Sequence, residues 1–272
     1  MSTNIEIKNY RIQKYEYLHC LDKYKSLKTI IMNVSDVCDR HCTFCPRSHG
    51  YKIPADRNAF MSIEVVNELA KQVDGKFFGT FSISGFGEPM FNKELKQIVG
   101  RLNKTTGHTC LTTNGYDCFR LGDIGADKID ISVYSEKDAE YFNSILDKLP
   151  DCVNLKMQYR AGNTFFNNRA GNAGAIETIP ENCCYITFMK LSIDTNGDIL
   201  QCCSDWKREY VLGNLFTDNI WDIWIDGLQK DRQYLINNER HKCKLCSKCN
   251  SPGDLYGVEF KNFWEKYYRE HQ

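Results

Sequence analysis

The chain has 272 residues, 42% of them hydrophobic, enough for one large domain or one domain with a small appendage. Its 35 basic and 35 acidic side chains balance, which argues against the basic surface of a typical nucleic-acid-binding protein. No segment approaches the ~18 consecutive apolar residues of a membrane span, and the N-terminus lacks the apolar core of a signal peptide. We therefore expect a cytoplasmic protein without a membrane or nucleic-acid partner.

Strand-like and helix-like segments alternate in the first part of the chain. After a polar, tyrosine-rich extension at 1–27, strands are predicted at 28–35, 78–85, 108–115, 128–135 and 154–160. Helical spacing lies between them, at 62–73, 92–104 and 136–149. This order predicts an α/β domain over 28–180, with βα units around a parallel sheet that is either a barrel or an open doubly wound sheet.

The composition changes after Gly162, where asparagine and glycine become frequent. Asn196-Gly197 separates two strand-like runs and is a strong hairpin signal. An amphipathic helical region follows at 219–238. We therefore expect a small second domain of a β-hairpin and helices over 181–250, and a terminal helix within 251–272.

Fourteen cysteines are a high number for this length, and the chain is too long for a small secreted disulfide scaffold. Four of them stand alone and resemble ordinary semi-buried residues. The other ten fall in two groups, at 38–45 and 183–249. Clustered cysteines without an export signal favour metal or redox chemistry.

Candidate functional residues follow the predicted strands. Three cysteines follow the first strand, the sequence Ser84-Gly-Phe-Gly-Glu-Pro89 follows the second, and Asn114 ends the third. Because the carboxyl ends of parallel strands meet at one edge of a sheet, these residues are predicted to form one site.

The first cysteine group, Cys38, Cys42 and Cys45, has the spacing C-x3-C-x2-C. Iron–sulfur clusters normally take four thiolates, so three leave one iron open to another ligand. With aromatic Phe44 before the last cysteine, this loop resembles the signature of the radical S-adenosylmethionine (radical SAM) superfamily. The resemblance implies a partial (β/α)6 TIM-like barrel, and a 4Fe-4S cluster whose free iron binds SAM and cleaves it to a 5′-deoxyadenosyl radical.

The resemblance also implies residues that bind SAM. Glu88 would meet the ammonium group, and Phe44 would pack near the adenine. The two glycine places of the family's G-G-E-P motif are taken either by Gly85 and Phe86 or by Gly85 and Gly87. Strand-end residues that would contact the ribose or carboxylate are Asn114, Ser132, Gln158 and Arg160. Each of these polar residues could instead be structural.

The second cysteine group resembles the SPASM/Twitch extension of radical SAM enzymes, which holds an auxiliary 4Fe-4S cluster. Seven cysteines cannot fully ligate two four-iron clusters, so we expect one auxiliary cluster. The resemblance implies Cys184 and Cys202 as ligands, with two of Cys243, Cys246 and Cys249. A structural zinc site of four cysteines is the alternative.

The two predicted clusters suggest an oxidoreductase. The family implies hydrogen abstraction from a small polar substrate, such as a sugar or aminocyclitol, with the auxiliary cluster as electron acceptor and flavodoxin or ferredoxin as an external one-electron reductant. Arg169 is the candidate substrate contact. The alternatives are a peptide-modifying maturase, an epimerase with Cys249 as hydrogen donor, and a non-catalytic iron–sulfur or zinc protein.

Overall fold

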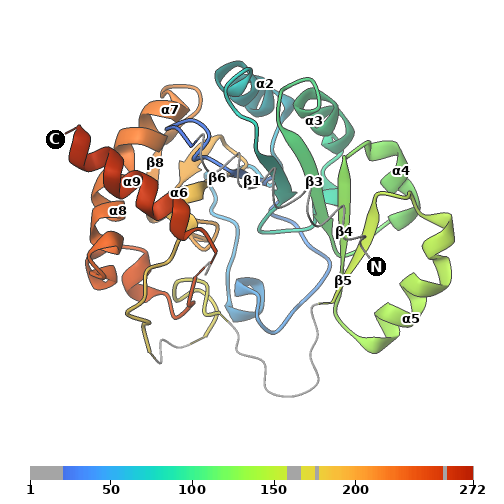
Figure 1. Ribbon diagram of the computed structural model, residues 1–272. Coiled ribbons are helices and arrows are strands. Elements are labelled where there is room, and N and C mark those ends of the chain that lie inside the picture. Colours follow the sequence, from blue (N-terminus) through green and yellow to red (C-terminus); the bar gives the residue numbers. More distant parts are fainter. Residues whose placement is uncertain (1–20, 158–166, 175–177, 254–255, 272) are drawn as a thin grey trace, which may run out of the picture.

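The computed structural model describes residues 21–157, 167–174, 178–253 and 256–271. These residues form an eight-stranded sheet with the order β5-β4-β3-β2-β1-β6-β7-β8 (Figure 1). Strands β1 to β6 are parallel, and β7 and β8 are antiparallel. The strands are β1 Thr29–Asn33, β2 Thr80–Ser84, β3 His108–Thr113, β4 Lys128–Val133, β5 Val153–Met157, β6 Lys190–Ile193, β7 Asp198–Leu200 and β8 Val211–Asn214.

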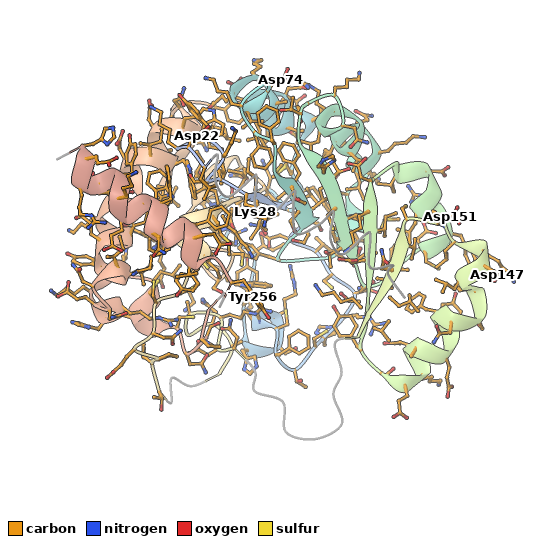
Figure 2. All side chains as sticks on the ribbon, in the orientation of Figure 1. Asp22, Lys28, Asp74, Asp147, Asp151 and Tyr256 are labelled. Atoms are coloured by element: carbon orange, nitrogen blue, oxygen red, sulfur yellow. The ribbon has the colours of Figure 1, made fainter. Side chains whose placement is uncertain are left out.

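Helices α2 to α5 cover one face of strands β1 to β5, and the remaining helices pack around β6 to β8 (Figure 1). The helices are α2 Ile63–Val73, α3 Leu95–Leu102, α4 Leu121–Ile124, α5 Glu136–Ile145, α6 Ile186–Met189, α7 Ile220–Asp222, α8 Gln229–Ile236 and α9 Val258–Glu270, with a π-helical turn at Ile223–Gly227. Charged side chains such as Asp74, Asp147 and Asp151 project outward from the helical side (Figure 2). The predicted alternation of strands and helices is confirmed.

The two faces of the parallel strands differ in chemistry. Residues facing the helices are apolar and buried, as Phe81, Ile83 and Leu111 show. Their neighbours along the strands, such as Ser82, Ser84 and Thr112, are partly exposed. Because a parallel sheet is normally covered on both faces and apolar on both, this alternation marks the helix-free face as a place for a ligand.

The predicted hairpin is present and continues the main sheet. Strand β6 pairs with β7 across the turn at Asn196 and Gly197, where Gly197 has φ +84°. Strand β6 also pairs in parallel with β1, so the sheet runs through the sequence boundary expected near residue 180. The sixth parallel strand therefore lies beside β1, whereas consecutive βα units would place it beside β5.

The C-terminal helices are fixed by a buried arginine. The guanidinium of Arg232 lies 4.1 Å from the ring centre of Trp224 and 3.7 Å from that of Trp264. It donates hydrogen bonds to the carbonyl of Thr187 and to the hydroxyl of Tyr268. Helix α9 is thereby held against α6 and α8. Among the described residues, no helix is both long and apolar enough to cross a lipid bilayer.

Candidate active site

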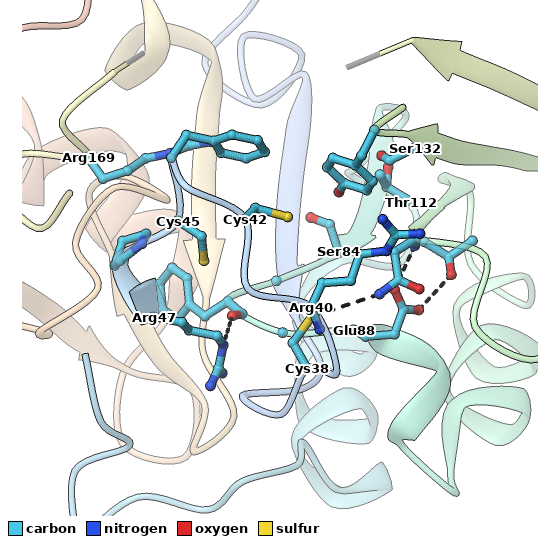
Figure 3. Close-up of a pocket in the computed structure, with 18 of the residues that line it drawn as sticks. Cys38, Arg40, Cys42, Cys45, Arg47, Ser84, Glu88, Thr112, Ser132 and Arg169 are labelled. Atoms are coloured by element: carbon cyan, nitrogen blue, oxygen red, sulfur yellow. Dashed lines mark hydrogen bonds between the residues drawn. The ribbon is translucent and has the colours of Figure 1, made fainter. Parts of the chain in front are cut away.

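The three-cysteine loop follows β1 and opens onto a pocket of about 250 Å³ at the carboxyl ends of β2 to β4 (Figure 3). The backbone amide of Cys45 donates to the carbonyl of Cys42 at 2.9 Å, which curls the loop. The amide of Arg40 donates to the sulfur of Cys38 at 3.4 Å. All three predicted thiol ligands line this pocket.

Most of the predicted SAM-binding residues line the same pocket. The structure brings together the three cysteines with Phe44, Gly85, Gly87, Glu88, Asn114, Ser132 and Arg169. Arg169 extends into the pocket from the side opposite Ser132 (Figure 3). The other two predicted residues, Gln158 and Arg160, lie outside the described residues.

The glycines after β2 pack against the cysteine loop. A β-carbon on Gly87 would lie 2.3 Å from the carbonyl oxygen of Val37, and one on Gly85 would lie 3.1 Å from the α-carbon of Asn33. The amide of Glu88 donates to the same Val37 carbonyl at 2.7 Å. Glycine is therefore required here because two backbone segments meet. Phe86, between the two glycines, is a buried core residue.

Glu88 is a buried carboxylate with three hydrogen-bond donors. It accepts from the hydroxyl of Thr113 and the amide of Asn114, each at 2.6 Å, and from the amide of Met90 at 3.0 Å. Burial raises the pKa of Glu88, and the three donors only partly oppose this. The side chain thus ties β2 to β3 beneath the pocket, in addition to any contact with a ligand.

Asn114 is bonded to the cysteine loop. Its amide nitrogen donates to Asp39 at 2.7 Å, and its amide oxygen accepts from the backbone of Tyr116 at 2.8 Å. The residue therefore positions the loop that carries Cys38. If Asn114 also contacted the ribose or carboxylate of SAM, its side-chain amide would have to form that contact in addition to these two hydrogen bonds.

The sequence analysis missed several residues that line the pocket, among them Arg40, Arg47, Tyr134 and Trp206. Arg40 pairs with Asp138 at 3.2 Å, and its guanidinium lies 4.8 Å from the ring centre of Tyr134. The ring of Phe44 also stacks on the ring of Tyr134, with the two ring centres 6.1 Å apart. Burial raises the pKa of Tyr134 to about 12, so its hydroxyl stays protonated. The position of Tyr134, two residues beyond Ser132 at a strand end, was the available signal.

A buried ion network joins the cysteine loop to the hairpin. Arg208 pairs with Asp36, two residues before Cys38, and with Asp194 at 3.2 Å in the hairpin turn. It also donates to the Tyr51 hydroxyl and, at 2.7 Å, to the carbonyl of Trp206. The side chains of Arg208 and both aspartates are at most 1% exposed. This network fixes how the two halves of the sheet meet at the pocket.

The second cysteine group gathers beyond the hairpin. The thiols of Cys202 and Cys203 share a hydrogen bond, and Cys184 is close enough to act on Cys202 electrostatically. Cys249 packs in a small apolar cluster with Leu245 that Cys202 also contacts. These contacts bring the distant segments 183–184, 202–203 and 243–249 together.

Two cations act electrostatically on this group. The hydrogen bond with Cys202, followed by the charges of Arg169 and Lys190, lowers the pKa of Cys203 to about 6. Arg169 also lines the pocket of the first cysteine group. One arginine therefore adjoins both cysteine sites.

The donor set of the first cysteine group fits an iron–sulfur cluster. Within the part of the chain that the structure describes, no three His, Cys, Asp or Glu side chains converge closely enough to hold one metal ion. A four-iron cluster is larger than one ion and takes thiolates that stand further apart. Three thiols facing one pocket fit a cluster with one open iron.

Comparisons with known proteins agree with the geometry. Residues 32–149 match the family profile of the radical SAM superfamily, and residues 183–250 match that of the SPASM iron–sulfur cluster-binding domain. The S-adenosyl-L-methionine-dependent 2-deoxy-scyllo-inosamine dehydrogenase of Niallia circulans is 24% identical over 85% of this chain and 95% of its own length. A GTP 3′,8-cyclase of Klebsiella pneumoniae is 31% identical over 42% of this chain and 36% of its own length.

A solved structure shows the same fold. BtrN in complex with AdoMet and 2-DOIA superposes with a TM-score of 0.69, covering 83% of this chain and 94% of that one at 24% identity. The predicted partial-barrel fold is thereby confirmed. The two domains imply SAM with a 4Fe-4S cluster and additional auxiliary iron–sulfur binding, as predicted. The chain therefore carries a radical SAM domain followed by a C-terminal SPASM domain.

Proposed function

We propose that this enzyme is a radical SAM dehydrogenase that oxidises an alcohol of a small polar substrate, such as a sugar, an aminocyclitol or a related metabolite. The observation that carries the proposal is the place of Arg169, which lines the first cysteine pocket and also reaches Cys203 electrostatically. A substrate bound at Arg169 would lie between the two cysteine sites. The N. circulans relative, whose name describes a SAM-dependent dehydrogenase, supports this reaction class.

The bound cofactors would supply a 5′-deoxyadenosyl radical and a second cluster able to accept an electron. Cys38, Cys42 and Cys45 would hold the first cluster. Phe44 and Tyr134 offer an aromatic surface for the adenine, because their rings stack at the pocket wall. Arg169 would hold and orient the substrate through hydrogen bonds from its guanidinium.

For the auxiliary cluster we propose Cys184, Cys202, Cys246 and Cys249. Cys243 is fully buried, and its sulfur lies 3.7 Å from the carbonyl of Asp231, where it behaves as a core residue. Cys249 instead shares an apolar cluster with Cys202, which favours it as a ligand over the role of an epimerase hydrogen donor. Replacing Cys243 by Ser should leave the iron content unchanged, whereas Cys249→Ser should lower it.

The domain division at 28–180 and 181–250, with an extension before and a helix after, remains our proposal for how the chain is organised. A cytoplasmic location and electron supply by flavodoxin or ferredoxin are further proposals. A peptide-modifying maturase or an epimerase would share the first cluster but would leave a different product.

Anaerobic reconstitution followed by iron, sulfide and zinc analysis tests the cofactor assignment. About eight irons per chain fit two four-iron clusters, and about four irons with one zinc would contradict the auxiliary cluster. The triple variant with Ala at Cys38, Cys42 and Cys45 should not form 5′-deoxyadenosine. Deuterium transfer from a labelled alcohol carbon into 5′-deoxyadenosine, together with a ketone product, would establish dehydrogenation; return of an inverted alcohol would identify an epimerase instead.

A further inference from the structure

Arg169 stands on a turn whose backbone conformation is unfavourable by itself. Arg169 and Ala170 have φ angles of +50° and +53°, and Gly171 follows with φ +82°. This left-handed region disfavours residues with a β-carbon, so two in succession persist only where surrounding contacts hold them. The turn nevertheless carries the Arg169 side chain into the pocket of the first cysteine group (Figure 3).

Hydrogen bonds from the end of the second cysteine group hold this turn. The backbone amide of Asn168 donates to the side-chain oxygen of Asn250 at 2.7 Å, and the backbone amide of Asn250 donates to the side-chain oxygen of Asn168 at 3.1 Å. The side-chain amide of Asn168 also donates to the carbonyl of Lys248 at 3.0 Å. Asn168 is 1% exposed and Asn250 is 9% exposed. The two asparagines therefore form a buried clamp between segments that are 82 positions apart.

Apolar packing joins the same two segments. Ala170 lies in a buried cluster with Leu245 and Cys249, and Cys202 packs against this cluster. Asn250 follows directly after Cys249 in the chain. The turn is thus both hydrogen-bonded and packed against the segment that contains two of the proposed auxiliary-cluster ligands.

We propose that Asn168 and Asn250 are positioning residues for the substrate contact Arg169. They hold its turn at the pocket, and binding of the auxiliary cluster fixes the segment to which the turn is clamped. This inference rests on the proposed function, which assigns the substrate contact to Arg169 and ligand roles to Cys246 and Cys249. The auxiliary site then has a second task beside electron transfer: a chain that lacks this cluster has a complete SAM site but an arginine that is not held in place.

Hydrogen–deuterium exchange of segment 167–174, measured by mass spectrometry on the full chain, tests the clamp without a substrate. The hydrogen-bonded amides of this segment include those of Asn168, Arg169, Asn172 and Ala173. These amides should exchange more slowly in the chain reconstituted with iron and sulfide than in the iron-free chain. In reconstituted Asn250→Leu they should exchange roughly 10- to 100-fold faster than in the reconstituted wild type, as expected when a buried hydrogen bond that resists local opening is lost.

Two further variants separate the clamp from general damage. Asn250→Asp keeps an oxygen that can accept from the Asn168 amide, so it should restore slow exchange. Asn143→Leu, at an exposed position on α5, is the matched control and should leave exchange of segment 167–174 unchanged.

Three outcomes would overturn the proposal. The first is equal exchange in reconstituted Asn250→Leu and reconstituted wild type, and the second is equal exchange in the reconstituted and iron-free wild type. If Asn250→Leu takes up too little iron, Asn250→Ala removes the same oxygen without adding bulk and replaces it in the test. The third outcome is loss of iron from both of these variants but not from Asn250→Asp, which would place the role of Asn250 at the cluster itself.

The proposed function fails separately from this inference. Reduced Asn250→Leu should form 5′-deoxyadenosine from SAM at the wild-type rate when no substrate is present, because the change lies outside the first cysteine group. If neither chain forms 5′-deoxyadenosine, the radical SAM dehydrogenase is contradicted, whatever the exchange shows. If both chains form it and exchange is equal, only the clamp is contradicted.

Discussion

Replacing Arg208 by Met should lower the free energy of unfolding more than any substitution at the protein surface. The arginine side chain and its partners, Asp36 and Asp194, are each at most 1% exposed. Methionine keeps much of the volume but removes the cation closest to both carboxylates, which keep only Arg47 at 3.8 Å from Asp36 and Arg57 at 3.7 Å from Asp194. Removing one partner of a buried ion pair costs about 3–5 kcal/mol in the free energy of unfolding, and we expect a loss in this range.

Arg232→Met is the matched control, because Arg232 is also fully buried. Its partners are the Thr187 carbonyl, the Tyr268 hydroxyl and two tryptophan rings, and it forms no ion pair with a carboxylate of the described residues. Burial lowers the pKa of Arg232 to about 10, which shows that this charge is poorly compensated. Its replacement should cost only about 1–2 kcal/mol, mainly from the unsatisfied carbonyl.

Both variants should be compared with the wild-type protein by urea unfolding, monitored by circular dichroism at pH 7 on the cluster-free, reduced chain. A loss in Arg208→Met that is no larger than in Arg232→Met would refute the reasoning that the aspartates depend on this cation. The double variant with Asp194→Asn should recover part of the loss, since one of the two buried carboxylates is then replaced by a neutral amide. Iron bound by the first cysteine group should fall in Arg208→Met as well, because Asp36 precedes Cys38.

Three further changes test the pocket. Gly87→Ala should lower iron incorporation at the first cysteine group, because a β-carbon at residue 87 would lie 2.3 Å from the Val37 carbonyl oxygen. Gly100→Ala is the control, because a β-carbon there would have no atom within 4 Å. Equal iron content in the two variants would contradict the close-approach argument. Tyr134→Leu should weaken SAM binding roughly tenfold in calorimetry through loss of the stacked surface, and unchanged affinity would place the adenine elsewhere. Burial raises the pKa of Glu88, so the folded protein binds the carboxyl proton of Glu88 more tightly than the unfolded chain does. The proton bound to Glu88 therefore stabilises the fold fully at a pH below the unfolded-state pKa of about 4.3. This stabilisation is lost as the pH rises through the higher folded-state pKa. The free energy of unfolding of the wild type relative to Glu88→Gln should therefore fall between pH 4 and pH 7, and a rise would show that the donors outweigh burial.

The parts of the fold that the sequence predicted correctly are those set by local patterns. Periodic apolar residues give the strands and helices between β1 and β5, and the Asn196-Gly197 turn gives the hairpin. The cysteine loop carries its own spacing signal, and the pocket contains all three of its cysteines. These features depend on residues that are close together in the chain.

The parts that could not be predicted depend on distant partners. Arg208 meets Asp36 across 172 positions, and neither residue has a distinctive local sequence. Arg40 meets Asp138 across 98 positions in the same way. The sequence analysis predicted functional glycines after the second strand, but not that the loop at Val37 packs against them. These contacts join residues that are far apart in the chain, and a single sequence does not reveal which distant residues pair.

The place of β1 in the sheet has a consequence for how the enzyme is made. Strand β1 comes first among the described strands, yet it lies inside the sheet, between β2 and β6. Its second neighbour is translated only about 160 residues later, as the pairing of Thr29 with Lys190 shows. Until then β1 is an open edge, and the strand that carries the proposed cluster-binding loop lacks one of its two neighbours. Iron delivery to this loop should therefore be productive only after translation of the hairpin, and a chain truncated near residue 180 should aggregate before it can be loaded.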